Sequence, residues 1–367
     1  MEERKPKIIF LYTHSGFAPG IEGHDIYTYP TNNKFIAGAM SDGFIYMLDQ
    51  LAVQGYVESV RVFVDARTDF GNRELSFHTK GYCVPNMMCC LGFIRPGDIL
   101  IIRGGFKPWI PFIQAIKERG GNQLVFYAAN TSNTRWPFWD IVLDDLSDSA
   151  KIQNDKFFFL FNKPVNEEIF YPDPAQKKIY DVCIGASHIH RKKGQFRVVE
   201  AAVEYEKLTG KRLKMIMPGG FIRCAQNATI LSLAKSGKVE LTLPEAVPRP
   251  ILNEFYNQSR LFIHAGVGGQ VDRSLLEALR CGVPSIIANP KRFPPWVRVP
   301  SRALFLLEDN EPDTIAEAIH AMLLCSDTED TENTSSHYQW VNGLQEVCIP
   351  RMLNLMKIIR EREATHV

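Results

Sequence analysis

The chain has 367 residues, which is long enough for two domains that each bury a core of their own. Hydrophobic residues make up 45% of it and charged residues 23%, as in an ordinary globular protein, so a disordered or fibrous chain is excluded. The 42 basic and 41 acidic residues leave a net charge of +1, so the sequence indicates no broad attraction to nucleic acid or to an anionic membrane.

The sequence shows no targeting or membrane segment. Residues 1–14 hold charges and a short apolar run, unlike a signal sequence, and no later run reaches the ~18 apolar residues of a membrane span. The 8 cysteines are scattered without a Cys-x-x-Cys pair, so reduced thiols are expected rather than disulfides or a zinc site. These features predict a cytoplasmic protein without a transmembrane segment, and they indicate no particular oligomeric state.

In the first half of the chain, strand-like runs alternate with helix-like runs. Strands are predicted at 7–13, 59–65, 98–104, 124–130 and 157–161. Helices are predicted at 33–55 and 107–121, where apolar residues recur at spacings of three and four and a glycine ends the pattern. This alternation predicts an α/β domain with a parallel sheet.

Residues 161–178 contain three prolines and a charge cluster, which is typical of an ordered connection between domains. A second α/β domain follows, with strands predicted at 179–187, 213–220, 239–243, 260–266, 283–289 and 303–309, and helices at 195–211, 228–238, 248–259 and 311–324. The polar residues 325–339 predict an exposed loop, and residues 340–362 predict a terminal helix broken near Pro350.

A glycine-rich loop follows the strand predicted at 260–266 and leads into a helix. Gly266, Gly268 and Gly269 let backbone N–H groups approach a ligand, and a helix that begins near Asp272 points its positive end at the same place. In a parallel sheet, ligands bind beyond the carboxyl ends of the strands, so the loop suits a phosphate or diphosphate. The alternative is a structural turn that binds nothing.

Side chains at the start of the same helix would assist such a ligand. Arg273 and Ser274 would donate hydrogen bonds to a phosphate, and Glu277, about one turn further on, would accept them from a ribose diol. The alternative for Glu277 is a solvated helix carboxylate.

A second loop of this kind lies within residues 183–202. Arg191, Lys192 and Lys193 directly precede Gly194, where a helix begins, so cations and a helix amino terminus converge. The alternative is a solvated basic turn. His188 and His190 lie in the same loop without a third ligand nearby in sequence, so no metal site is expected.

The loops after strands of the first domain carry further polar residues. His14 and Ser15 follow the first strand, and His14 would contact a substrate hydroxyl or move a proton, unless it merely caps the strand. Arg103 and Asn130 follow two later strands. Three tryptophans lie nearby and would either stack on sugar rings or pack in the domain: Trp109, Trp136 and Trp139.

Three segments of the second half, in order and at the right spacing, resemble GT-B glycosyltransferases, above all the large retaining group called family four. "FNKPVNEEIFYPD" is similar to the segment that enters their nucleotide-sugar domain, and "CIGASHIHRKKGQFRVVEAA" to their "vGR…KG" strand and loop. "ILNEFYNQSRLFIHAG…LLEALRCGVPSIIAN" resembles the stretch that holds their motif glutamates. The resemblance covers residues 161–290 and is weak in the first half.

The resemblance implies an α/β protein of GT-B fold, in which two Rossmann-like domains with parallel sheets face a central cleft. Residues 1–163, with a C-terminal helix at about 348–367 that crosses back to them, would bind the acceptor, and residues 164–347 the nucleotide-sugar donor. Lys193 matches the family lysine on the diphosphate, Glu277 the glutamate on the donor ribose, and residues 273–275 the phosphate-binding turn.

The expected site residues follow from these matches and from the loops described above. The donor-binding residues are expected to be Gly16, Gly185, Arg191, Lys193, Gly268, Gly269, Arg273, Ser274, Leu275 and Glu277. The acceptor-binding residues are expected to be His14, Ser15, Arg103 and Asn130, and the catalytic residues His14, Arg191 and Lys193.

Two positions depart from the family pattern. Gly269 stands where the first motif glutamate, which contacts the donor sugar, is expected. Ala186 replaces the arginine of "vGR" and leaves Arg191 as a substitute. The departures put the recognition of the sugar, and activity itself, in question.

The expected function is therefore transfer of a sugar from a nucleoside diphosphate sugar, such as a UDP- or GDP-sugar, to a hydroxyl of a glycan or other acceptor. The resemblance implies retention of configuration. No metal or other cofactor is expected, because cations and helix dipoles would stabilise the leaving diphosphate. The alternatives are an epimerase or inverting transferase of the same fold and a non-catalytic nucleotide- or sugar-binding module.

Overall fold

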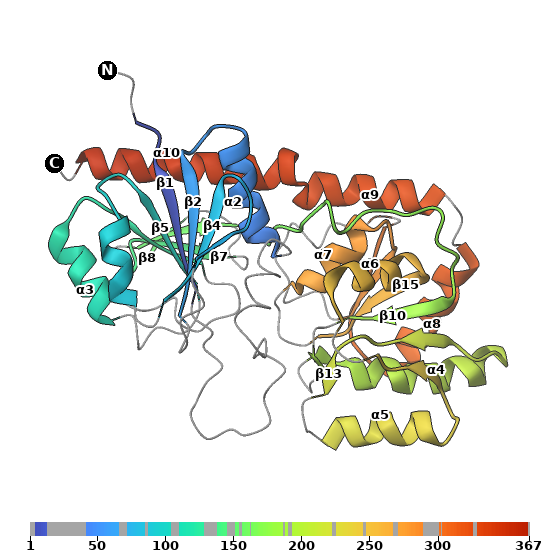
Figure 1. Cartoon of the computed structure of the whole chain (residues 1–367). Helices are drawn as coiled ribbons and strands as arrows, with labels where there is room; N and C mark the ends of the chain where they lie inside the picture. The colour runs from blue at the N-terminus through green and yellow to red at the C-terminus, as the bar shows by residue number, and fades with distance from the viewer. Residues whose placement is uncertain are drawn as a thin grey trace. The chain divides into compact units, whose positions relative to one another are not determined.

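The computed structural model describes residues 4–12, 42–65, 72–84, 87–103, 110–127, 138–144, 151–153, 156–161, 163–185, 188–189, 193–221, 225–244, 247–266, 271–288, 301, 303–325 and 329–365. The chain divides into two compact units. The first consists of Met1–Asn166 and Leu344–Val367, and the second of Glu167–Gly343 (Figure 1). The domain boundaries expected from the sequence lie a few residues from these.

A twisted, mainly parallel sheet forms the centre of the first unit. Its strands are β1 (Lys7–Tyr12), β2 (Ser59–Asp65), β3 (Asn72–Glu74), β4 (Thr79–Val84), β5 (Ile99–Arg103), β6 (Leu124–Tyr127), β7 (Ile141–Asp144), β8 (Lys151–Gln153) and β9 (Lys156–Leu160). Among the described residues their order is β3-β4-β2-β1-β5-β6-β7-β9-β8. Only the short edge strands β3 and β8 pair antiparallel to their neighbours within this part of the chain.

Helices cover both faces of this sheet, because alternate side chains of each strand point to opposite faces. On one face, Ile8 and Phe10 of β1 pack with α2 (Gly43–Val53) and α10 (Ile349–Thr365). On the other face, Ile9 and Leu11 pack with the 3₁₀ helix η1 (Met87–Phe93) and with α3 (Ile110–Arg119). The expected return of the terminal helix to the first domain is therefore confirmed.

A six-stranded, fully parallel sheet forms the centre of the second unit in the described residues. Its strands are β10 (Tyr180–Ile184), β12 (Lys214–Ile216), β14 (Glu240–Thr242), β15 (Ser259–His264), β16 (Ser285–Ala288) and β17 (Leu304–Leu307). The order β14-β12-β10-β15-β16-β17 is that of a Rossmann-type sheet, in which the direction of winding reverses between the first and fourth strands along the chain. Two strands of two residues each, β11 (His188–Ile189) and β13 (Gly220–Phe221), pair separately.

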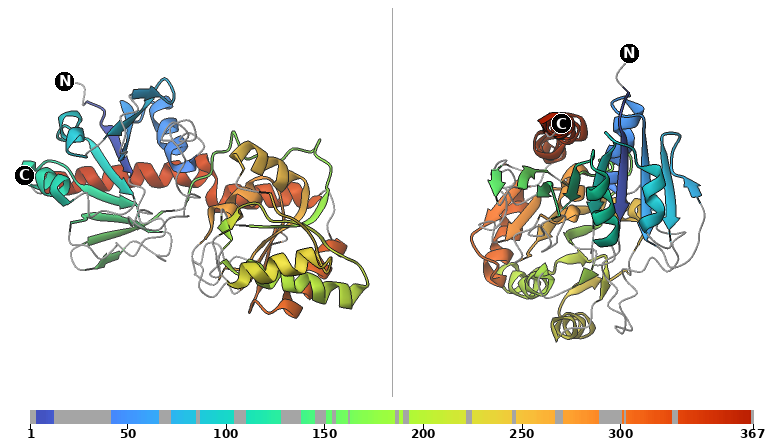
Figure 2. Two further views of the ribbon diagram at one scale, coloured as in Figure 1. Left: turned by 60° about the horizontal axis from the view of Figure 1, so that its bottom comes forward. Right: turned by 90° about the vertical axis from the view of Figure 1, so that its left-hand side faces the viewer.

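The helices of the second unit also form two layers. One layer consists of α4 (Gln195–Thr209), α5 (Ala225–Lys235) and α8 (Pro312–Cys325) (Figure 2). Their residues Val198, Ile230 and Ile315 share one core with inward residues of the sheet. On the opposite face lie α6 (Arg249–Asn257) and α7 (Arg273–Arg280), where Tyr256 packs edge-on against Phe262 of β15. The GT-B fold expected from the sequence, with two Rossmann-like domains, is confirmed.

The expected loop at 325–339 is wrong. Residues Glu329–Asn342 form helix α9, which packs on α7. The segment is polar overall, yet Thr334, Tyr338 and Val341 recur at spacings of four and three and are buried, which is the pattern of a helix with a narrow packed stripe. The guanidinium of Arg280 on α7 lies 5.9 Å from the Tyr338 ring centroid.

The terminal helix begins later than the sequence indicates. A π-helical turn, η6 (Leu344–Cys348), follows Gly343, and Pro350 lies in the first turn of α10 rather than at a break. Proline is favoured there because first-turn N–H groups have no partner within a helix. Strands β3, β4, β7 and β8 were not expected, because short strands carry too little alternation to be distinguished from loops.

Candidate donor-binding site

The carboxyl ends of β10 and β15 meet at the point where the winding of the second sheet reverses. These strands are hydrogen-bonded neighbours, with Cys183 opposite Phe262 and Ile184 opposite Ile263. In open α/β sheets such a point leaves a crevice, because the two connections leave in opposite directions. Gly185 directly follows β10, and Ala265 and Gly266 directly follow β15.

Close packing, rather than an unusual backbone angle, requires a glycine at position 185. A Cβ atom at this position would overlap the ring of Phe262 and lie 3.0 Å from Oγ of Ser274. A side chain would therefore push the strand end away from the start of α7. Glycine brings the backbone after β10 against the first turn of that helix.

Gly194 brings the start of α4 equally close to the end of β15. It is the N-cap of α4 with a φ of 67°, and a Cβ atom would overlap the carbonyl of Ala265. This left-handed conformation and the lack of space both require glycine. Lys193, directly before it, is thereby held beside the loop that follows β15.

Lys193 pairs with Asp272, the N-cap residue of α7. Its Nζ donates to Oδ1 of Asp272, while Oδ2 lies 3.0 Å from Nε2 of His264. Nδ1 of His264 accepts from the backbone N–H of Gly266 at 3.3 Å, so Nε2 is the nitrogen that carries a proton toward Asp272. Three side chains from β15, α7 and the residue before Gly194 thus form one network.

The carboxyl of Asp272 remains ionised in this network. Its burial alone would raise the pKa, but the hydrogen bonds from His264 and Lys193 and the positive charge of Lys193 outweigh burial and lower the pKa well below its ordinary value of 3.8. A largely buried negative charge therefore stands at the amino end of α7.

The first turn of α7 presents hydrogen-bond donors beside this network. The side chain of Asp272 makes no capping bond to the helix, although aspartate is a favoured N-cap. Oγ of Ser274 is buried and has no hydrogen-bond partner among the described residues. The positive end of α7 and an unused hydroxyl therefore meet next to Gly185.

Glu277 lies one turn further into α7 and is only 4% exposed. Its Oε1 lies 3.3 Å from Nη1 of Arg249, and its Oε2 accepts from the hydroxyl of Tyr256 at 3.3 Å. Burial, followed by the nearby Glu277 charge, raises the pKa of Tyr256, so this hydroxyl stays protonated. The alternative of a solvated helix carboxylate is wrong, because α6 supplies both of these partners.

Residues 167–336 match the family model described as Glycosyl transferases group 1. The match begins where the second unit begins and ends inside α9, so it includes Gly185, Lys193 and Glu277. These residues of the second unit are similar to this glycosyltransferase family. The resemblance stated from the sequence is thereby confirmed, together with the assignment to the glycosyltransferases, which transfer sugars from nucleotide sugars.

Solved structures support the same fold over the whole glycosyltransferase chain. A sucrose-phosphate synthase from Thermosynechococcus elongatus has 14% identity and a TM-score of 0.64, with 98% of this chain and 100% of that one covered. A glycosyltransferase from Rickettsia africae has 13% identity and a TM-score of 0.67 (97% and 99% covered), and Anabaena HepE, in complex with UDP and glucose, has 11% and 0.62 (96% and 99%). No curated protein sequence matches the chain.

Several site residues expected for this glycosyltransferase lie outside the described residues. They are His14, Ser15, Gly16, Asn130, Arg191, Gly268 and Gly269. The structure brings together Gly185, Lys193, Ser274 and their neighbours Arg273 and Leu275 at the sheet ends, with Glu277 in the same helix.

In the first unit, Arg103 lies at the carboxyl end of β5. Its Nη1 pairs with Oδ2 of Asp42, the N-cap of α2, at 3.2 Å, and its guanidinium lies 5.3 Å from the Tyr127 ring centroid. Trp139 is 2% exposed and stacks on Phe126, so it packs in the core and does not bind a sugar.

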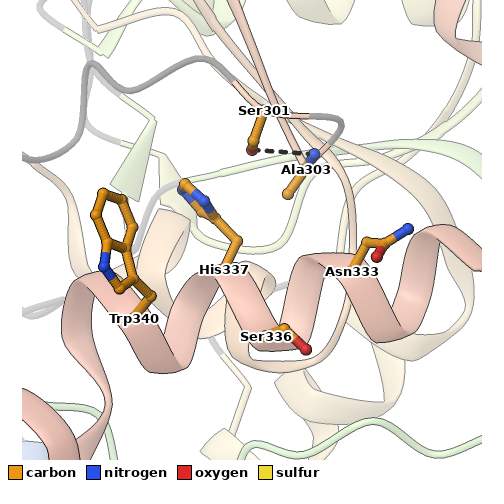
Figure 3. A pocket seen from close by; sticks show the side chains of 6 residues that line it. All are labelled: Ser301, Ala303, Asn333, Ser336, His337 and Trp340. Atoms are coloured by element: carbon orange, nitrogen blue, oxygen red, sulfur yellow. Dashed lines mark hydrogen bonds between the residues drawn. The ribbon is translucent and has the colours of Figure 1, made fainter.

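A recess elsewhere in the second unit is not part of this site. A cavity of about 530 Å³ lies between α9 and the residues just before β17, at the amino end of that strand (Figure 3). Its lining residues are Ser301, Ala303, Asn333, Ser336, His337 and Trp340. The residues described above lie at the carboxyl ends of the strands, which is the opposite edge of the sheet.

Neither a metal cluster nor a membrane helix is found in the described part of the chain. No group of three or more His, Cys, Asp or Glu side chains there is placed to hold a metal ion. Of the helices described, none combines the length and apolar character needed to cross a membrane.

Four residues of the site were missed from the sequence: His264, Asp272, Arg249 and Tyr256. His264 follows the apolar residues 261–263 at the end of a mostly buried strand, and Asp272 holds the N-cap position, so each carried a local signal. Arg249 and Tyr256 carried none, because only the packing of α6 beside α7 brings them to Glu277.

Proposed function

We propose that this glycosyltransferase transfers a sugar from a nucleoside diphosphate sugar to a hydroxyl of a glycan or other acceptor, with retention and without a metal. The observation that supports it most is the meeting of Gly185, Lys193 and the amino end of α7 at the carboxyl ends of β10 and β15. Such a place suits a diphosphate, because backbone N–H groups, a helix dipole and a cation act on the same volume.

Glu277 is proposed to bind the donor ribose. Its carboxylate accepts hydrogen bonds, which is what the two hydroxyls of a ribose diol require, and Arg249 and Tyr256 contact it from α6. The two partners hold the carboxylate in one orientation, which reduces the entropy lost when the donor binds.

The chemistry follows from where charge develops. When the bond between the sugar and the β-phosphate breaks, negative charge builds on the leaving diphosphate. Lys193, Arg191 and the amino end of α7 are proposed to stabilise this charge, as preorganised donors do in other enzymes. His14, Ser15, Arg103 and Asn130 remain the proposed acceptor-side residues.

The cysteine pattern supports a cytoplasmic location for this reaction. Cys90, Cys183 and Cys281 are buried free thiols. Burial raises the pKa of Cys183 and of Cys281, which keeps both thiols protonated and unreactive.

A thermal-shift screen with UDP, GDP, ADP and their sugars tests the donor site first. UDP is the first choice, because the structural neighbour HepE was solved with UDP and glucose. A nucleotide at about 100 times its Kd adds about 2.7 kcal/mol of stability, which gives a clear rise in Tm. If no nucleotide raises Tm, the donor-site proposal is wrong.

Two substitutions separate the proposed roles. Lys193→Ala is expected to weaken binding of both pyrophosphate and the nucleotide, whereas Glu277→Gln is expected to weaken only the nucleotide. Lys207→Ala is the matched control, because Lys207 lies at the far end of α4 and pairs only with Glu204 among the contacts described. Calorimetric titration measures each affinity, and unchanged binding in both site variants contradicts the assignments.

Turnover distinguishes the enzyme from its alternatives. Product anomers identified by NMR separate retention from inversion, and activity that persists in excess EDTA is expected for a metal-independent transferase. Gly269, where the family has a sugar-contacting glutamate, favours a non-catalytic nucleotide-binding module as the second candidate. Nucleotide binding without turnover of any donor would support that module.

A further inference from the structure

The amino end of α7 carries a negative charge at the place where an anionic ligand is expected to bind. Asp272 is the N-cap residue of this eight-residue helix, and its side chain is 10% exposed. A phosphate placed at the start of α7 and within reach of Lys193 would approach the Asp272 carboxylate. Like charges in a partly buried place repel strongly, because little water screens them.

Asp272 also forms an ion pair with Lys193, the cation that is proposed to bind the diphosphate. Oδ1 of Asp272 accepts directly from Nζ of Lys193, which is 23% exposed in its side chain. An ammonium group engaged by a carboxylate has part of its charge neutralised. A diphosphate must therefore compete with Asp272 for Lys193.

His264 keeps the carboxylate in place when that competition occurs. Its Nε2–H donates to Oδ2 of Asp272 at 3.0 Å, and its Nδ1 is fixed by the N–H of Gly266. The His264 ring is 3% exposed, so it is held by the end of β15. If Lys193 turned toward a ligand, Asp272 would keep a hydrogen-bond partner and would stay at the amino end of α7.

We propose that Asp272 is a built-in counter-ion of Lys193 that the donor's diphosphate displaces, and that it sets the affinity of the donor site. The inference rests on the proposed function, because it assigns a further residue to the same site. Asp272 weakens the binding of both the donor and the diphosphate product, and it keeps Lys193 paired while the site is empty. A partly buried ammonium without a partner would be destabilising.

The decisive test is a gain of affinity. Asp272→Asn removes the charge and keeps the shape of the side chain. The variant is expected to bind UDP, GDP or ADP, whichever the unchanged protein binds, at least about tenfold more tightly in calorimetric titration, since one nearby like charge is removed. A variant that was merely damaged would bind more weakly, so a gain does not arise from a structural defect.

A second variant and a control keep the test decisive. Asp272→Ser retains a good N-cap without a charge, and it serves if Asp272→Asn folds poorly. Glu206→Gln removes one charge from an ion pair with Arg212 at the other end of α4 and is expected to leave nucleotide affinity unchanged. Lys193→Met is expected to reduce affinity more in the Asp272→Asn background than in the unchanged protein, because Lys193 is then free for the ligand.

The outcomes separate this inference from the proposed function. If the unchanged protein binds a nucleotide and both Asp272 variants bind it equally or more weakly, the counter-ion role is overturned but the donor site is not. Binding by neither the unchanged protein nor the variants overturns the donor site as well.

Discussion

Single residues in the second unit determine how closely its backbone segments approach. Gly185 and Gly194 both lie at the sheet end, where any side chain would overlap a neighbouring residue. Gly194 also has a φ of 67°, which side chains disfavour. These two glycines bring the starts of α4 and α7 to the carboxyl ends of β10 and β15, and they make the proposed diphosphate site possible.

Replacing Gly185 with alanine tests this close approach. Gly185→Ala is expected to lower the free energy of unfolding by about 1–3 kcal/mol, because the added Cβ must displace Phe262 or Ser274. Gly92→Ala is the control, since a Cβ there meets nothing within 4 Å. Urea unfolding of both variants measures the difference, and a Gly185→Ala protein as stable as the control would contradict the packing described.

The ionised state of Asp272 predicts a pH dependence of stability. The pKa of its carboxyl is lower in the folded protein than its ordinary value of 3.8, so the unfolded chain takes up the proton first as the pH falls. The stabilisation is present in full above that value and is lost as the pH falls through the folded pKa.

The unfolding free energy of the unchanged protein, relative to that of Asp272→Asn, is therefore expected to decrease below about pH 4 and to stay constant above about pH 5. Urea unfolding of both proteins across this pH range measures it. A difference that does not change with pH would mean that His264 and Lys193 do not hold the carboxylate in its charged form.

The sequence allowed part of the site to be predicted residue by residue. Lys193, Gly185 and the start of α7 could be placed because they follow predicted strands, and the ends of parallel strands share one edge. Asp272 and its pairing with Lys193 were missed, because the partners are far apart in the chain and only folding joins them. The environment of Glu277 was missed for the same reason.

Whole helices and strands were predicted well where their apolar pattern is strong and poorly where tertiary contacts stabilise them. The long strands and the helices α4 and α8 have strong apolar periodicity and were predicted close to their observed bounds. Helix α9 was predicted as a loop, because its composition is polar and its buried stripe is narrow. Its packing on α7, and not intrinsic helix propensity, accounts for it.

Helix α10 is expected to contribute strongly to the stability of the first unit. Met352 and Leu355 are fully buried in the core shared with β1 and α2. Leu355→Ala is expected to cost about 2–5 kcal/mol of unfolding free energy, through the lost burial and the cavity left behind. Lys357→Ala, whose side chain is 74% exposed, is the control in the same helix, and equal unfolding curves would contradict this packing.

For the molecule as a whole, the two units differ in how the chain builds them. The second unit is one continuous segment, Glu167–Gly343, whereas the first needs both ends of the chain. The second unit has a hydrophobic core of its own, centred on β10, β15 and the helices α4 and α8. Loss of the C-terminal segment therefore affects the two units unequally.

A truncated chain that ends at residue 343 tests whether loss of the C-terminal segment affects the first unit more than the second. It is expected to lose the cooperative unfolding of the first unit, because the core around Phe10 and Phe44 loses α10. The second unit should still unfold cooperatively and should bind the same nucleotide as the full chain. Differential scanning calorimetry with and without nucleotide measures both, and a truncated chain with no unfolding transition would contradict the independence of the second core.

The position of α10 also determines the order of events during synthesis. Residues 344–367 leave the ribosome only after the whole second unit, yet the first unit cannot complete its core without them. The proposed donor-binding unit is fully made before that moment and can fold first, since domains fold as units while the chain is synthesised. The amino-terminal half must therefore wait, with one face of its sheet partly uncovered, until α10 emerges.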